Sequence, residues 1–500
     1  MELSLDHVDV LIVGAGLSGI GAAHHLQSKC PGKSYALLEA RAEIGGTWDL
    51  FRYPGIRSDS DMFTLGYNFR PWTAAKSIAD GPSILDYVRR TASEGGIDQH
   101  IRFNHRVLRA EFSSAAARWI VEAERTDTQE TIQISCGYLM VCSGYYRYDE
   151  GFTPDFPGSE RFAGEIVHPQ HWPEDLDYSG KNVVVIGSGA TAVTLLPAMA
   201  EKAGHVTMLQ RSPSYIFALP GIDPIASALR RVLPARLAYP LLRWKNVLLA
   251  ILTFQLSRKR PSLVKRVIRA GVKRRLPEGY DLDTHFKPRY EPWDQRVCFV
   301  PDGDLFDAIS AGRASVLTDQ IETFTERGLQ LASGAELEAD VVVTATGLNL
   351  LALGGIRLAI DGRELELSET MSYKGMMLSG VPNLAFAVGY TNASWTLKCD
   401  LVCEYVCRLL NYMDEHGYQQ CVPQDDPSVT RQPMIDFSSS YVQRAIESFP
   451  KQGSKAPWRL RQNYALDILG MRFGSLEDGA MRFSAVAAQP VATEPLAVSS

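Results

Sequence analysis

Short apolar runs of strand length, each followed by a glycine-rich turn, mark the beginning of the chain. Residues 8–13 form the first run, and glycines follow at positions 14, 16 and 19. A helical stretch comes next, and a second apolar run, 35–38, ends at Glu39. The order strand, glycine turn, helix, strand and acid predicts a βαβ unit that binds a dinucleotide. The glycines let the backbone approach the pyrophosphate, and Glu39 lies where a carboxylate can accept hydrogen bonds from the adenosine ribose.

The same pattern recurs in the middle of the chain. Residues 182–186 form a strand, the turn Gly-Ser-Gly-Ala-Thr-Ala follows at 187–192, and 206–209 form the next strand. Here the second strand runs into Arg211 and Ser212 instead of an acid. An acid would repel a ribose 2′-phosphate, whereas Arg211 would pair with it, so this second site favours NADP over NAD. A single glycine turn could belong to any α/β domain, but two turns with matching strands indicate two dinucleotide sites.

The order of these units predicts an α/β fold in which one Rossmann-like domain is inserted into another. Two further strands, 138–142 and 341–344, end in glycine turns and would complete the two sheets. Two dinucleotide sites in one chain imply hydride transfer from a nicotinamide to a bound flavin, so we assign FAD to the first site. Because the second of these strands comes long after the second βαβ unit, the NADP domain is expected to interrupt the FAD domain. The predicted boundaries are 1–150 and 352–500 for the FAD domain, with a disordered tail at 485–500, 151–215 and 293–351 for the NADP domain, and 216–292 for a basic helical insert.

The spacing of the eight cysteines tests whether a cysteine pair accepts the electrons of the reduced flavin. No CxxC or CxxxxC pair is present, so the redox pair of a disulfide reductase is missing. Cys399, Cys403 and Cys407 recur every four residues without a nearby histidine. This spacing is typical of the buried apolar face of a helix, and we prefer that interpretation to a metal or redox site; no metal is expected. Oxygen is then the expected electron acceptor.

Composition and charge are those of a soluble protein of two or three domains. The chain has 500 residues, 45% of them hydrophobic, and a formal net charge of −6. This excludes disordered and fibrous classes and argues against a protein built to wrap nucleic acid. The longest strongly apolar stretch, 247–256, is about half a membrane span. With no signal peptide pattern and no disulfide framework, a cytoplasmic location is expected.

The net charge conceals a strongly basic segment. Fourteen Lys and Arg and no acid lie between Asp223 and Glu278. We favour a helical insert that shapes the substrate cavity and has a solvated basic face. The alternative is an interfacial surface, 224–277, that contacts anionic lipid and admits apolar substrates.

Two motifs carry a resemblance to a known family. The chain has F-x-G-x-x-x-H-x-x-x-W-P beginning at Phe162 and G-x-W-x-x-x-x-Y-P-G-x-x-x-D beginning at Gly46. Together they resemble the signatures of Baeyer–Villiger monooxygenases, the class B flavoprotein oxygenases, over essentially the whole chain. Within that class the segments 45–62, 168–178, 187–195, 292–296 and 390–398 are most similar to the ethionamide-activating group of mycobacteria.

The resemblance implies FAD and NADPH as cofactors, O₂ as co-substrate and an apolar ketone or thioether as substrate. A C4a-peroxide formed on the flavin would convert the ketone to an ester or lactone. The alternatives are S- or N-oxygenation of thioamides and sulfides, or an NADPH-flavin reductase or redox-sensing flavoprotein. The sequence does not predict an oligomeric state.

The resemblance also assigns roles to single residues. A fixed cation must stabilise the peroxide anion, and Arg296 is the candidate, with Asp59 holding its side chain; the alternative for Arg296 is a surface ion pair with Asp294 or Asp304. His168 is expected to couple domain motion rather than transfer a proton, and Trp172 to anchor packing; these two and Phe162 and Gly164 form the fingerprint. The expected cofactor contacts are Gly14, Gly16, Ser18, Gly19, Glu39, Thr47, Trp48, Asp49, Leu50, Arg57, Ser58, Asp59, Val107, Gly187, Ser188, Gly189, Ala190, Thr191, Ala192, Arg211 and Ser212.

Overall fold

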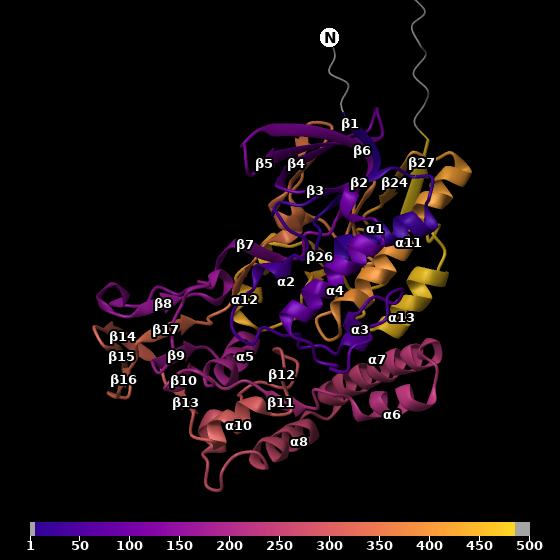
Figure 1. Ribbon diagram of the computed structural model, residues 1–500. Helices are drawn as coiled ribbons and strands as arrows, with labels where there is room; N and C mark the ends of the chain where they lie inside the picture. Colours follow the sequence, from indigo (N-terminus) through magenta and orange to yellow (C-terminus); the bar gives the residue numbers. More distant parts are fainter. Residues whose placement is uncertain (1–5, 486–500) are drawn as a thin grey trace, which may run out of the picture.

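The computed structural model describes residues 6–485, and its core is built on two separate sheets (Figure 1). The larger sheet has nine strands in the order β20-β19-β4-β5-β6-β1-β2-β3, with β23 also paired to β6. Its strands are β1 (Asp6–Val13), β2 (Tyr35–Leu38), β3 (Ile101–Arg102), β4 (His105–Ser113), β5 (Arg118–Arg125), β6 (Thr131–Val141), β19 (Arg357–Ile360), β20 (Arg363–Glu364) and β23 (Leu384–Phe386).

The larger sheet combines a parallel and an antiparallel part. β1 is parallel to β2 and β6, which is the arrangement of a βαβ unit, and β4, β5 and β6 form an antiparallel meander. The helices α1 (Leu17–Lys29) and α11 (Trp395–His416) pack against each other on one face. Since β19, β23 and α11 follow the second dinucleotide unit in the chain, the first domain is assembled from two distant segments of sequence.

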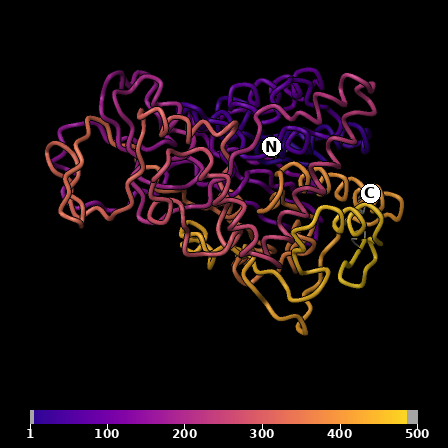
Figure 2. Tube along the Cα trace, turned by 90° about the horizontal axis from the view of Figure 1, so that it is seen from below, coloured from indigo at the N-terminus to yellow at the C-terminus, as the bar shows by residue number. Residues whose placement is uncertain are grey.

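The smaller sheet is entirely parallel, with the order β13-β10-β9-β17-β8. Its strands are β8 (Glu165–Val167), β9 (Asn182–Ile186), β10 (His205–Gln210), β13 (Ala314–Thr318) and β17 (Val341–Thr344), and α5 (Ala190–Met199) and α10 (Asp304–Ser310) pack beside it. Figure 2 shows this domain at one end of the molecule. The predicted α/β class, with one Rossmann-like domain inserted in the other, is confirmed.

Two short strands join the domains. β7 (Tyr146–Gly151) leads into the smaller domain, β18 (Leu348–Leu350) leads back, and the two pair antiparallel. The chain therefore crosses between the domains twice at one place, as a two-stranded ribbon. The boundaries at 150–151 and 351–352 stay predictions; the first lies within β7 and the second follows the end of β18.

The insert is helical and lies outside both sheets. It begins after β11 (Ile216–Leu219), ends before β12 (Cys298–Pro301), and these two strands pair with each other. Between them are α6 (Pro224–Val232), α7 (Ala235–Lys259), α8 (Pro261–Lys273) and the short α9 (Leu282–His285). Figure 1 shows α6, α7 and α8 gathered along one side of the molecule. In the described part of the chain, no helix is long and apolar enough to cross a membrane.

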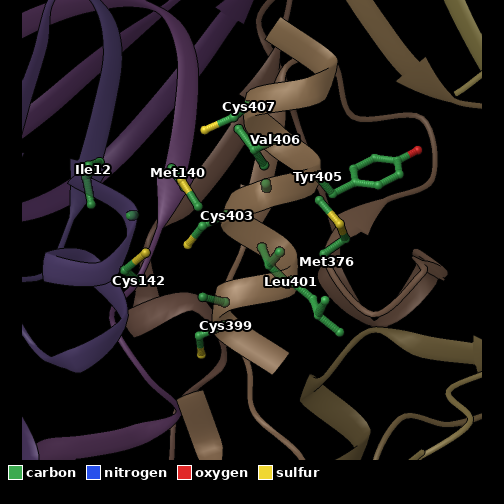
Figure 3. Close-up of a cluster of buried hydrophobic side chains, with 14 of the residues drawn as sticks. Ile12, Met140, Cys142, Met376, Cys399, Leu401, Cys403, Tyr405, Val406 and Cys407 are labelled. Carbon is green, nitrogen blue, oxygen red and sulfur yellow. The ribbon is translucent and has the colours of Figure 1, made fainter. Parts of the chain in front are cut away.

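The cysteine stripe of α11 lies in the core of the larger domain. Figure 3 shows the sulfur atoms of Cys399, Cys403 and Cys407 on the side of α11 that faces the strands of Ile12 and Met140. All three cysteines are buried, and all eight in the chain are free thiols. The stripe is therefore an apolar packing face. Residues 1–5 and 486–500, which include most of the tail expected at 485–500, lie outside the described residues.

Candidate cofactor and substrate site

The first glycine turn joins β1 to α1 and could accept no other residue at two positions. Gly14 has a φ of +102°, and a Cβ there would lie 2.7 Å from the carbonyl oxygen of Cys142. A Cβ on Gly19 would lie 1.8 Å from the carbonyl oxygen of Gly14. The turn is therefore pressed against its own helix and against the end of β6, and the first turn of α1 borders a large cavity. This is the geometry that accommodates a pyrophosphate at a helix N-terminus.

Glu39 closes this turn from the end of β2. Its side chain is buried, with 6% exposed. One carboxylate oxygen accepts a hydrogen bond from the backbone N–H of Ala15 at 2.7 Å, and the other accepts from the N–H of Arg41 at 2.9 Å. Burial raises the pKa of the carboxyl group, while the two backbone N–H groups and Arg41 partly offset that rise. Glu39 therefore braces the loop as well as bordering the cavity.

The second glycine turn joins β9 to α5 and is more open. Gly187 has a φ of +137°, and a Cβ there would lie 2.3 Å from the carbonyl oxygen of Ala345. At Gly189, by contrast, a Cβ would meet no atom within 4 Å. The hydroxyl of Ser188 donates to the carbonyl of Ser212 at 3.0 Å, which ties the turn to the end of the next strand. Arg211 borders the cavity beside this turn, and within residues 6–485 it makes no ion pair.

Most of the predicted cofactor residues line one cavity of about 1370 Å³ that runs between the two glycine turns. The predicted residues in its lining are Gly14, Gly16, Ser18, Glu39, Thr47, Trp48, Arg57, Ser58, Asp59, Val107, Gly187, Ser188, Gly189, Ala190, Thr191, Arg211, Ser212 and Arg296. A cavity of this size, with a helix N-terminus at both turns, fits two dinucleotides.

Some predicted contacts lie elsewhere. Asp49, with 1% exposed, is surrounded by Arg41 at 2.6 Å and by Arg52 and Arg89 at 3.3 Å, so its carboxylate is occupied by arginines. Leu50 and Ala192 are buried in the apolar core of the smaller domain. Gly19 is not part of the cavity lining, and it acts by letting α1 approach the turn.

Arg57 and Ser18, although they line the cavity, are also held by protein partners. Both terminal nitrogens of Arg57 contact the carboxylate of Asp304, at the start of α10. Ser18 accepts a hydrogen bond from the indole N–H of Trp395 at 2.8 Å, and its oxygen lies 3.2 Å from the sulfur of Cys399. Each therefore joins elements that are distant in sequence.

Arg296 and Asp59 form an ion pair with a nitrogen–oxygen distance of 2.5 Å. Arg296 precedes β12, where the chain returns from the insert, whereas Asp59 lies in the loop before α3 (Met62–Leu65). About a third of the Arg296 side chain, 35%, is exposed, and it faces the cavity that it lines. The carboxylate of Asp59 raises the pKa of Arg296, so the guanidinium keeps its charge throughout the working pH range. The alternative partners of Arg296 are occupied: Asp294 pairs with Arg258, and Asp304 with Arg57.

Three tyrosines surround Arg296, and the sequence did not single them out. Burial raises the pKa of Tyr145, Tyr146 and Tyr441, so all three stay neutral and add no negative charge next to the guanidinium. Tyr145 stacks on Trp395 with ring centroids 5.2 Å apart. Tyr145 and Tyr146 directly follow the glycine at the end of β6, which is a signal that could have identified them. Nothing in the local sequence marks Tyr441.

A second cavity of about 300 Å³ begins at Arg296. It shares Tyr145, Arg296, Tyr390, Trp395 and Tyr441 with the large cavity. Apolar residues including Met434, Ile435, Phe437, Leu460, Leu466 and Met471 form much of its remaining wall. Arg296 therefore stands at the junction of the large cavity and a smaller, mainly apolar one.

One of the ion pairs in the wall of the small cavity, that of Lys398 and Asp467, was not found from the sequence. Lys398 of α11 lies 2.7 Å from a carboxylate oxygen of Asp467, and the hydroxyl of Tyr390 donates to the same oxygen at 2.7 Å. Asp467 belongs to α13 (Tyr464–Ile468), which continues into the π-helix η7 (Leu469–Phe473). The ion pair therefore attaches this short helix to α11.

The long helices of the insert do not line these two cavities as expected, although Tyr290 near its end borders the large one. Helices α6, α7 and α8 contribute no residue to either lining. The inner face of α7 packs instead against α3, where the guanidinium of Arg243 donates to the carbonyl of Gly66 at 2.7 Å and the hydroxyl of Tyr239 donates to the carbonyl of Tyr67 at 3.0 Å. Apart from Tyr145 and Arg296, the wall of the small cavity comes from the chain after residue 370.

The fingerprint histidine sits on the ribbon that joins the domains. Nδ1 of His168 accepts from the N–H of Gln170 at 3.1 Å, and Nε2 lies 3.3 Å from the carbonyl oxygen of Gly347. Its ring covers Gly151 so closely that a Cβ there would come within 1.9 Å. Burial lowers the pKa of His168, which favours the neutral ring. His168 is absent from the lining of both cavities.

The other fingerprint residues pack within the smaller domain. A Cβ on Gly164 would lie 2.3 Å from the carbonyl oxygen of Asp340, so the position requires glycine. Phe162 meets Phe324 edge to face with centroids 6.0 Å apart, and Trp172 packs on the domain's core. Phe162, Gly164 and Trp172 also lie outside both cavity linings.

Comparisons with known proteins agree with this arrangement. The flavin-binding monooxygenase-like family matches residues 77–352, and the NAD(P)-binding Rossmann-like domain matches residues 12–77. The FAD-containing monooxygenase EthA of Mycolicibacterium smegmatis is 56% identical over 481 residues, which cover 96% of this chain and 97% of that protein.

Two solved structures share the fold. An oxidized steroid monooxygenase bound to NADP has a TM-score of 0.73 at 22% identity, and an open cyclohexanone monooxygenase has a TM-score of 0.72 at 18% identity; each match covers 96% of this chain and 100% of the other. The resemblance read from the motifs is confirmed. The chain belongs to the flavin-binding monooxygenase-like family, and it is an FAD- and NADPH-dependent monooxygenase.

Proposed function

We propose that the protein is a Baeyer–Villiger monooxygenase that converts apolar ketones to esters or lactones. The observation that carries this proposal is the position of Arg296, a permanent cation held by Asp59 where the cofactor cavity meets the small apolar cavity. The balanced reaction takes one ketone, one O₂, one NADPH and one proton to one ester, one NADP⁺ and one water. The protein's part is to bind, to orient and to stabilise developing negative charge.

The two glycine turns fit the two cofactors. FAD would lie along the first turn, with its pyrophosphate over the start of α1 and its ribose at Glu39, whose carboxylate has acceptor capacity beyond its two backbone bonds. NADPH would lie along the second turn, where Gly189 leaves open space at the start of α5. Arg211, which forms no ion pair within residues 6–485, would offer its guanidinium to the 2′-phosphate. When both are bound, the reduced flavin supplies the activated oxygen.

Arg296 would stabilise the oxyanion that develops as oxygen adds to the ketone carbonyl. Asp59 fixes the orientation of the guanidinium and keeps it charged. The neutral rings of Tyr145 and Tyr441 border the same junction and would limit the access of water to it. A charged donor in a site from which water is excluded acts more strongly than in bulk solvent, so the anionic route is favoured.

The small cavity indicates the substrate class. Its volume of about 300 Å³ and its mainly apolar lining suit an aliphatic or cyclic ketone with few polar groups. A thioether of similar shape would also fit. We infer a cytoplasmic protein from the eight free thiols, which suit a reducing compartment.

The test compares Arg296→Ala and Arg296→Lys with the wild type, using a medium-chain methyl ketone and a matched thioether. We expect ester formation to fall by roughly 10²–10³-fold in Arg296→Ala, because a fixed donor to an oxyanion is lost, and to recover in part in Arg296→Lys. Sulfoxidation does not require this anion and should fall much less. FAD content and the rate of flavin reduction by NADPH control for misfolding.

Three results would contradict the proposal. Full ester formation by Arg296→Ala would remove the assigned role of Arg296. Efficient sulfoxidation with no ester from any ketone would assign heteroatom oxygenation as the function. Peroxide release with every substrate would instead favour an NADPH-flavin reductase.

A further inference from the structure

The outward face of α7 is apolar although it is exposed. Leu237, Leu241, Trp244, Leu248 and Leu252 recur at intervals of three or four residues, so they form one stripe along the helix. Each of these side chains is between 43% and 63% exposed. Of the sixteen large apolar side chains exposed in residues 6–485, twelve lie between Ile222 and Val267. Such a concentration marks a surface that meets an apolar partner.

The stripe cannot be hidden by rotation of the helix. The opposite face of α7 is anchored, because Arg243 and Tyr239 are buried and donate to the backbone carbonyls of Gly66 and Tyr67. Arg243 also lies 3.5 Å from the carboxylate of Asp400 in α11. Turning the apolar face inward would break these buried polar contacts.

The C-terminal part of the chain extends the same surface. α13 and η7 lie beside α7 (Figure 1), and the rings of Tyr464 and Trp244 are 6.0 Å apart. This short helix exposes Leu469 by 61% and Phe473 by 75%. Its other side borders the small cavity through Leu466, Gly470 and Met471. One turn of helix thus separates the cavity interior from the exposed apolar surface.

The charge around the stripe identifies its partner. Nine exposed cations of the insert make no ion pair in the described residues: Arg231, Arg236, Lys259, Arg260, Arg266, Lys273, Arg274, Arg275 and Arg289. An isologous dimer through this face would set these cations against their own copies, which is unfavourable. An anionic lipid surface would neutralise them while it takes up the leucines and aromatic rings.

We propose that α7, together with Leu469 and Phe473, docks the enzyme on the surface of an anionic phospholipid membrane, and that apolar substrate passes from the membrane past α13 and η7 into the small cavity. The docking is independent of the reaction. The passage of substrate rests on the proposed function.

Docking is tested by co-sedimentation of the FAD-loaded, full-length protein with phosphatidylglycerol vesicles and with phosphatidylcholine vesicles, without NADPH. We expect binding to phosphatidylglycerol that weakens as salt rises, and little binding to phosphatidylcholine. Leu241→Ser, Leu248→Ser and Leu252→Ser combined should weaken it by at least about tenfold, because three apolar anchors are lost. Ile166→Ser, an exposed apolar residue of the smaller domain, is the apolar control and should bind like the wild type.

A second pair of variants, each with three substitutions, tests how much the positive charge of the insert contributes to vesicle binding. Lys259→Gln, Arg260→Gln and Arg266→Gln combined should weaken phosphatidylglycerol binding and flatten its salt dependence. The control Arg118→Gln, Lys202→Gln and Arg363→Gln removes three exposed charges from the two dinucleotide domains, also unpaired in the described chain, and should have little effect. The docking proposal is overturned if the wild type ignores phosphatidylglycerol, or if the serine variant binds as well as the wild type. It is also overturned if the wild type is a dimer that the serine variant converts to a monomer.

Substrate passage is tested by kinetics. The serine variant should show a raised KM for a long-chain methyl ketone carried in phosphatidylglycerol vesicles, with an unchanged kcat and an unchanged KM for a short, water-soluble ketone. If the wild type and the serine variant have the same KM for the vesicle-borne ketone, the proposed passage of substrate from the membrane is wrong. If neither ketone is oxygenated while vesicle binding persists, the proposed function fails and the docking surface stands.

Discussion

The two glycine turns of this protein share one sequence pattern but differ in how tightly the structure encloses them. In the first, Gly14 is pressed against the end of β6 and the buried Glu39 accepts two backbone hydrogen bonds. In the second, Gly189 faces open space and Arg211 is exposed without an ion pair in the described residues. An enclosed site suits a cofactor that stays bound, whereas an open one suits a cofactor that exchanges at each turnover. A βαβ motif therefore determines what class of ligand binds, and its surroundings determine how firmly.

Gly14→Ala should have the largest effect, because it tests directly whether the first glycine turn is enclosed. Alanine is strained at a φ of +102°, and its Cβ would lie 2.7 Å from the carbonyl oxygen of Cys142. We expect a loss of roughly 1–3 kcal/mol in the free energy of unfolding and protein purified largely without FAD. Denaturant unfolding and the flavin absorbance per chain measure both effects. Normal FAD content at unchanged stability would show that the first turn is not enclosed as described.

Arg211→Gln examines the open site. Loss of a charge-assisted pair to the 2′-phosphate should raise the KM for NADPH by roughly 10–100-fold, with the KM for NADH nearly unchanged. Steady-state flavin reduction with each nucleotide gives the ratio of the KM for NADPH to the KM for NADH. Arg57→Gln is a useful comparison, because that guanidinium is engaged by Asp304 and its loss should not shift the preference between nucleotides in the same way. Equal losses with NADPH and NADH would place the 2′-phosphate elsewhere.

Glu39→Gln tests how the enclosed first turn affects the pH dependence of stability. Burial raises the pKa of Glu39 above its ordinary value of 4.5, so the folded protein binds this proton more tightly than the unfolded chain does. The contribution of Glu39 to stability is therefore complete below pH 4.5 and is lost as pH rises through the raised pKa. Unfolding measured from acid to neutral pH should show this decline in the wild type and a flatter profile in Glu39→Gln. Parallel profiles for the two proteins would contradict the assignment.

Gly189→Ala should have the smallest effect. The added Cβ meets no atom within 4 Å, and Gly189 does not have a positive φ, so the fold should keep its stability within about 0.5 kcal/mol. The methyl group would project into the space assigned to NADPH, and a modest rise in the KM for NADPH is expected. Thermal unfolding measures the effect on stability, and steady-state kinetics measure the effect on the KM for NADPH. A large loss of stability would show that the second turn is as enclosed as the first.

The sequence predicted the fold class and most of the cavity lining because glycine turns and strand ends are local features. Gly14 and Gly187 adopt positive φ values, which a tight turn after a strand requires and which glycine in the sequence signals. The residue that ends the second strand of each βαβ unit is found from the same order of elements along the chain. The cysteine stripe of α11 could also be interpreted locally, because its spacing alone distinguishes a buried face from a paired redox site.

Asp49 and the helices of the insert show what local reasoning leaves out. The cofactor contact expected of Asp49 stays a prediction, but its carboxylate is engaged by Arg41 and Arg52 nearby in sequence and by Arg89 of a more distant segment. The insert was expected to wall the substrate cavity, whereas the buried contacts of Arg243 hold α7 against α3. Lys398, Asp467 and Tyr441 reach the site from more than a hundred residues after Arg296, and no short pattern connects them.

By itself the sequence determined that the protein has two dinucleotide domains, one inserted in the other, and a helical segment with fourteen cations and no acid. The backbone requirements of glycine and the two-residue and 3.6-residue periodicities are local, so they can be read along one chain. Only the tertiary structure decided that Arg296 meets Asp59 between two cavities, and that the leucines of α7 are exposed on a helix that packs beside α13. These contacts join segments separated by more than two hundred residues, and they follow from how the packed elements fit together rather than from any pattern along the sequence.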